Sequence, residues 1–186
     1  MQTNNSSNST SARSFRRPIT AICNFTDQQL ENLQHNYHKR SLSTGGISSL
    51  QEVLNEKTRR LTNGLDGDKV VRLILDLSRR SPDGFTTYFE VWRSIYPTHP
   101  WRGQSSVRRI MKVLGEVIHH CVANNLPIIT ALIVRRANRQ HSPTAVTNIF
   151  KYARNLGCNV GVCAESFVTD QILLAFDLFD NNTTIH

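Results

Sequence analysis

The sequence predicts a mainly helical α+β domain that carries a small two-stranded sheet. Apolar residues recur at helical spacing along most of the chain, polar capping signals precede several of these runs, and only two short segments have strand-like patterns. A chain of 186 residues, 39% of them hydrophobic, can bury one core without further stabilisation by disulfides. We expect an N-terminal arm over residues 1–20 and a single globular domain over 21–186.

Three helices are expected in the first part of the domain, residues 21–84. Thr26 and Gln29 form a capping-box pattern before "LQHNYHKR", and Ser49 and Glu52 repeat it before "VLNEKTRRL". A third helix is expected over "KVVRLILDLSRR", which ends at the turn sequence "SPDG".

The second part of the domain, residues 85–141, has a more specific order of elements. Thr87 and Glu90 cap a short helix, "YPTHPWRGQ" interrupts it, and a long helix is expected over residues 105–123. The run "IITALIV" then has the length and β-branched content of a buried strand. This succession of helix, connector, helix and strand resembles a winged helix-turn-helix, in which the second helix enters a DNA groove.

The long helix of residues 105–123 has two distinct faces. Its apolar residues share one arc of about 120° at the helical period: Val107, Ile110, Met111, Leu114, Val117, Ile118 and Cys121. The opposite arc holds a row of Arg108, Lys112 and His119, with Arg109, Glu116 and His120 beside it. We therefore expect a core-facing side and a basic side that faces an acidic ligand.

The third part, residues 142–186, is expected to contain a helix, a short helix that Glu165 or Ser166 begins, and a strand. Ser142 and Pro143 are typical of the first positions of a helix, which Gly157 ends. The later run "LLAFDLF" is expected to form a second strand beside "IITALIV".

The charge of the chain is concentrated in its middle. Residues 57–140 hold 15 Lys and Arg against six carboxylates, a net charge of +9, whereas residues 141–186 carry −2. Arginine dominates this segment, and its guanidinium forms bidentate contacts with phosphate and guanine. The side chains expected to contact nucleic acid are Arg102, Arg108, Arg109, Lys112, Arg135, Arg136 and Arg139. Arg13, Arg16 and Arg17 of the arm are expected to follow the backbone or enter a minor groove.

These observations favour a DNA-binding regulator of transcription, and they leave RNA binding open. A basic adaptor that binds an acidic protein is a further alternative. A homodimer is possible, because many regulators of this kind bind DNA as dimers.

The sequence contains no recognisable catalytic or phosphate-loop motif, so we lean against an enzyme and expect no cofactor. If a catalytic site exists, His119, His120, Glu90 and Glu116 are the first acid-base candidates. The four cysteines, at positions 23, 121, 158 and 163, lack the paired spacing of a zinc site. Without a secretory h-region or a membrane-length apolar run, the chain is expected to be cytoplasmic, associated with the nucleoid if it binds DNA, and to have reduced thiols.

Overall fold

A computed structural model describes residues 22–40, 48–62 and 64–181. The predicted arm over residues 1–20, with Arg13, Arg16 and Arg17, lies outside the described residues. Within them the chain forms seven α-helices: α1 (Asp27–Arg40), α2 (Leu50–Leu61), α3 (Gly67–Arg79), α4 (Tyr88–Ile95), α5 (Gln104–Ala123), α6 (Pro143–Asn155) and α7 (Ala164–Asn181). Two 3-10 turns, η1 (Ile22–Asn24) and η2 (Ile129–Leu132), and two short strands, β1 (Thr86–Thr87) and β2 (Ile133–Val134), complete the fold.

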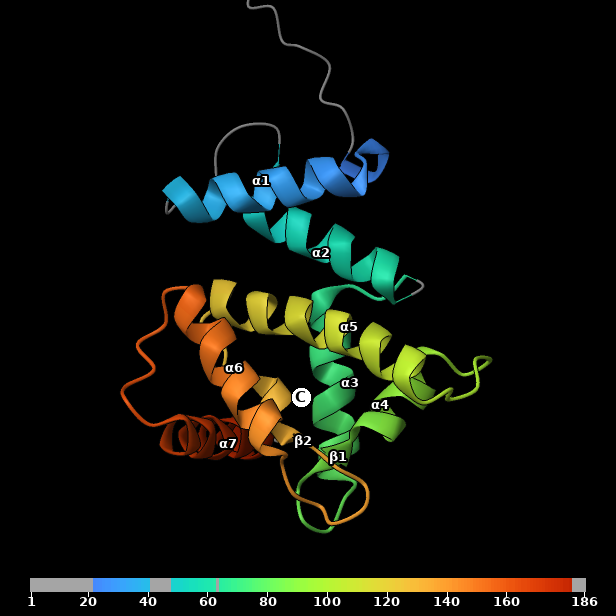
Figure 1. The fold of residues 1–186 in the computed structure, drawn as a ribbon, viewed down its shortest axis with the longest axis vertical. Coiled ribbons are helices and arrows are strands. Elements are labelled where there is room, and N and C mark those ends of the chain that lie inside the picture. Colours follow the sequence, from blue (N-terminus) through green and yellow to red (C-terminus); the bar gives the residue numbers. More distant parts are fainter. Residues whose placement is uncertain (1–21, 41–47, 63, 182–186) are drawn as a thin grey trace, which may run out of the picture.

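Helix α5 runs through the middle of the molecule (Figure 1). Helices α1 and α2 pack on one side of it, while α3, α4, α6 and α7 lie on the other. The principal core lies between α5 and this second group, and it includes Ile110, Val117 and Cys121 of α5. A smaller cluster, with Leu30 and Val53, holds α1 against α2. The mainly helical α+β class predicted from the sequence is confirmed, and so are the bounds of the long helix to within one residue.

The capping signals of the sequence occur as hydrogen-bonded caps in the structure. Ser49 and Glu52 form a complete capping box at α2, and Thr87 and Glu90 form another at α4. The Ser142 hydroxyl accepts a hydrogen bond from the Ala145 N–H at the start of α6. Because these caps satisfy N–H groups that have no partner within the helix, they fix where each helix begins.

The two-stranded sheet is present, but the strand predicted at "LLAFDLF" is wrong. Strand β2 pairs in parallel with β1, so that Thr86 faces Ile133 and Thr87 faces Val134. The run "LLAFDLF" lies in α7, and "IITALIV" forms η2 before it becomes a strand. Helix α7 has one buried side, where Ala175 is fully buried while Leu173 and Leu174 are 57% and 48% exposed. This one-sided burial has helical rather than strand periodicity.

The burial of α5 differs from the expectation in two places: on the apolar arc near its N-terminus and on the polar side near its C-terminus. On the apolar arc, Val107 is 40% exposed, and Met111 packs against the principal core but is only half-buried. On the polar side, His120 is fully buried because α2 packs over the C-terminal half of α5. The helix is therefore covered on its polar side near the C-terminus, while its N-terminal half is buried only on the side of Ile110 and Val113.

Candidate nucleic-acid interface and an adjoining pocket

The N-terminus of α5 is free of the acidic and capping groups that would neutralise it. Gly103 precedes the helix with a φ of 52°, a left-handed conformation that favours glycine, and it provides no side-chain cap. The first turn contains no acidic residue. Arg102 lies just before this turn and Arg108 just after it, and both are exposed. The positive end of the helix dipole and two guanidinium groups thus lie together at this end of α5.

Five of the cations predicted to contact nucleic acid have no carboxylate partner among the described residues. All five are exposed and form no ion pair there: Arg102, Arg108, Lys112, Arg135 and Arg136. Several other cations of the basic segment, including Lys57, are paired with carboxylates. Arg72, Arg80 and Arg93 are likewise exposed without an ion pair to a described residue, so α5 and the segment after β2 carry only part of the unpaired charge.

Arg136 connects the segment after β2 to the connector before α5. Its guanidinium carbon lies 5.2 Å from the ring centre of Phe89, whose ring centre lies 6.1 Å from that of Trp101. Trp101 precedes Arg102 in the chain and is only partly buried. The two basic segments therefore meet at a shared aromatic contact.

Arg109 occupies the other end of the same aromatic cluster. Its guanidinium carbon lies 4.3 Å above the ring of Tyr96, which packs against Trp92 at 4.4 Å between ring centres. Tyr96 is fully buried and its hydroxyl donates a hydrogen bond to the Leu61 carbonyl. Trp92 is 5% exposed, and its indole N–H donates to the His99 carbonyl at 3.0 Å. These two aromatic side chains belong to the core, so they are not available to stack on bases.

The guanidinium of Arg139 is engaged within the protein. It donates hydrogen bonds to both carboxylate oxygens of Asp83, to the Ser81 hydroxyl at 2.6 Å and to the Phe85 carbonyl at 2.8 Å. This contact holds the pKa of Asp83 well below its usual range. Arg139 therefore links the segment after β2 to the turn before β1. Because its guanidinium is used in these contacts, Arg139 has little freedom to contact a ligand.

The C-terminal part of the polar row faces α1 and α2. Glu116 forms an ion pair with Lys57 at 2.7 Å, and burial raises the pKa of its carboxyl group. The Gln34 amide lies 2.6 Å from Nδ1 of His119. Burial, together with the nearby charges of His38 and Lys57, lowers the pKa of His119 to about 4. The groups opposite this part of α5 are thus residues of the same chain.

His120 is enclosed between α2 and α3. Its Nδ1 lies 2.9 Å from the Gln51 amide nitrogen, and its Nε2 lies 3.0 Å from an Asp68 carboxylate oxygen. The neutral tautomer with the proton on Nε2 satisfies both contacts, since the ring then accepts from Gln51 and donates to Asp68. Gly67 lies against the face of this ring, where a side chain would collide with it.

The acid-base candidates have different environments. Glu90 accepts hydrogen bonds from Thr87 within the cap of α4, and His120 is enclosed, so both have structural contacts. Glu116 and His119 line a cavity of about 320 Å³ together with Lys57. In the part of the chain that the structure describes, no group of three His, Cys, Asp or Glu side chains could hold a metal ion.

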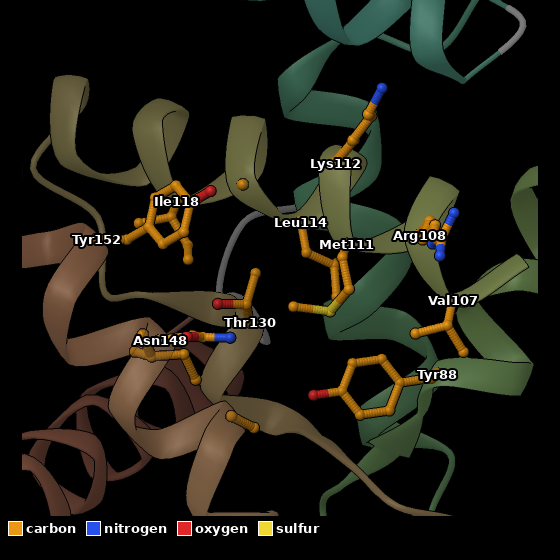
Figure 2. A pocket seen from close by; sticks show the side chains of 13 residues that line it. Tyr88, Val107, Arg108, Met111, Lys112, Leu114, Ile118, Thr130, Asn148 and Tyr152 are labelled. Carbon is orange, nitrogen blue, oxygen red and sulfur yellow. The ribbon is translucent and has the colours of Figure 1, made fainter. Parts of the chain in front are cut away.

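A larger pocket of about 540 Å³ opens beside the basic end of α5 (Figure 2). Helix α5 forms one wall, Asn148 and Tyr152 of α6 form another, and Tyr88 and Thr130 come from α4 and η2. Two predicted nucleic-acid contacts, Arg108 and Lys112, belong to its lining, and Figure 2 shows the Lys112 side chain directed away from the pocket interior. Sequence reasoning missed this pocket. It placed Val107 and Met111 on the apolar arc, and both line the pocket.

The chain matches no protein-family model, and neither curated proteins nor solved structures show significant similarity to it. Among the described helices, none combines the length and the apolar character that spanning a bilayer requires. The functional assignment therefore rests on the geometry of the chain itself.

Proposed function

We propose that the protein binds nucleic acid through the N-terminal half of α5, with duplex DNA as the preferred ligand and regulation of transcription as the outcome. The observation that carries the proposal is a set of exposed cations without carboxylate partners among the described residues, at this end of α5 and in the segment after β2: Arg102, Arg108, Lys112, Arg135 and Arg136. Binding phosphate would break no ion pair of these five side chains, so their full charge is available for electrostatic capture.

The uncapped N-terminus of α5 supports a docking mode in which this end of the helix approaches the ligand. Backbone N–H groups at a helix N-terminus bind phosphate, and Arg102 and Arg108 flank the first turn of α5. Arg136 lies against Phe89 and supplies charge from the segment after β2. Arg108 and Lys112 are one helical turn apart, a spacing that suits contacts along a groove.

The test is a fluorescence-anisotropy titration of a labelled duplex, a single strand and a structured RNA at several salt concentrations. The double variant Arg108→Ala, Lys112→Ala should lower the salt slope of duplex binding by about two units if both side chains neutralise phosphate. As a matched control, Lys39→Ala, Arg40→Ala removes the same charge at the far end of α1 and should leave the slope unchanged. Arg108→Ala alone should relax the preference at one base pair if Arg108 contacts a base edge.

The proposal would be overturned if the double variant Arg108→Ala, Lys112→Ala bound the duplex with the same affinity and the same salt slope as the parent. Tighter binding of the RNA than of the duplex would favour the RNA-binding alternative. Absence of binding to all three nucleic acids at moderate salt would leave an acidic protein partner as the remaining hypothesis.

A further inference from the structure

The pocket between α5 and α6 contains polar groups that have no partner among the described residues. Thr130 is 3% exposed, and its buried hydroxyl oxygen has no hydrogen-bond partner in the structure. The side chains of Tyr88 and Asn148 also line the pocket. A buried hydroxyl at a pocket wall can form a hydrogen bond with a ligand that enters, and that bond would offset the cost of burying it unpaired.

The rest of the pocket is suited to an apolar molecule. Met111, Leu114, Ile118 and Ile149 line its interior. Val107 and Tyr152, which are 40% and 45% exposed, flank it and are two of the few large hydrophobic side chains exposed among the described residues. A volume of about 540 Å³ falls within the range of sites for small organic ligands.

The charged residues that line the pocket favour a negatively charged ligand. Its lining includes two cations, Arg108 and Lys112, and no carboxylate. Both cations are exposed and lack an ion pair with any described residue, so they can turn toward a bound anion. Both belong to the wall that α5 forms, so an anion beside them would leave the apolar part of the ligand facing Met111 and Leu114.

We propose that this pocket binds a small carboxylic acid with an apolar body. The carboxylate is held at the mouth by Arg108 and Lys112, and the apolar body fills the space between α5 and α6. Polar atoms on that body would pair with Thr130, Asn148 or Tyr88. This site stands independently of the proposed nucleic-acid binding, although it uses two of the same cations.

The test compares two probes of the same shape, 2-naphthoate and its neutral counterpart 2-naphthamide, by isothermal titration calorimetry in the absence of nucleic acid. The parent protein should bind naphthoate about fivefold more tightly than naphthamide, because charge-assisted contacts at a solvent-exposed mouth contribute modestly. The double variant Arg108→Ala, Lys112→Ala should lose this preference and bind the two probes equally. The control variant Lys39→Ala, Arg40→Ala should keep it.

A second variant tests the location of the site. Asn148→Trp places a large side chain at the half-buried Asn148 position in the pocket wall, and it should abolish binding of both probes while the circular dichroism spectrum stays that of the parent. Equal affinities of the parent for the two probes, or binding that survives Asn148→Trp in the folded protein, would overturn the proposal. Failure of the parent to bind either probe would overturn it as well, whatever the outcome of the nucleic-acid titrations.

Discussion

Replacing Gly67 with alanine would place a methyl group against the buried imidazole of His120. A Cβ at this position would lie 2.7 Å from Cγ of His120 and closer still to Nδ1, distances that real side chains do not adopt. The ring cannot retreat freely, because it is fully buried and held by Gln51 at 2.9 Å and Asp68 at 3.0 Å. The substitution must therefore strain the packing between α3 and α5.

The expected cost follows from two opposing effects. Alanine is favoured over glycine in a helix by about 0.5–1 kcal/mol, whereas overpacking a core costs about 1–3 kcal/mol. We expect Gly67→Ala to lower the free energy of unfolding by about 1–2 kcal/mol, measured by urea denaturation with an unchanged m-value.

A double-mutant cycle isolates the collision as the cause. In a His120→Ala background the ring is absent, so Gly67→Ala should be neutral or stabilising, and the coupling free energy should be about 1 kcal/mol or more. A gain in stability from Gly67→Ala in the parent would refute the reasoning, because the helix propensity of alanine would then outweigh the contact with His120.

Three further predictions concern other buried groups. Because the pKa of His119 falls to about 4 in the fold from an ordinary value of 6.5, the unfolded chain binds a proton in this window that the folded chain does not. The free energy of unfolding should therefore decrease as the pH falls from 6.5 toward 4, and His119→Gln should flatten this dependence in pH-dependent urea titrations. Thr130→Val removes the buried hydroxyl without a partner and should raise the free energy of unfolding by about 1 kcal/mol, whereas an equal loss would show that the hydroxyl is satisfied in solution. Burial raises the pKa of the Cys121 thiol to about 12, so a thiol reagent should label the exposed Cys23 and Cys163 in the native protein and Cys121 only after unfolding; rapid native labelling of Cys121 would contradict its burial.

Local signals in the sequence predicted the helices well because their causes are local. Ser49 and Thr87 each cap a helix through a hydrogen bond to a residue three positions later, and that spacing can be found without knowing the fold. The error at "LLAFDLF" has a physical reason too. Short apolar runs suit both a buried strand and one side of a helix, and the neighbours that decide between them lie far away in sequence.

The candidate site was only partly predictable for a related reason. The exposed cations at the start of α5 follow from helical periodicity, which placed Arg108 and Lys112 on the polar side. The burial of His120 depends on how α2 packs over α5, and the internal contacts of Arg139 depend on how the segment after β2 meets the turn at Asp83. Such contacts between distant segments leave no periodic pattern in the sequence.

The parallel pairing of β1 with β2 has a consequence for the order of folding. The chain passes through the whole of α4 and α5 between Thr86 and its partner Ile133, so pairing of the two strands closes a long loop. The few hydrogen bonds between two-residue strands cannot offset the entropic cost of closing that loop. We therefore expect the sheet to form after α5 has packed against α3, in a late and rapid step. Destabilising substitutions in β1 should then accelerate unfolding and leave the refolding rate nearly unchanged, whereas those in the buried face of α5 should slow refolding.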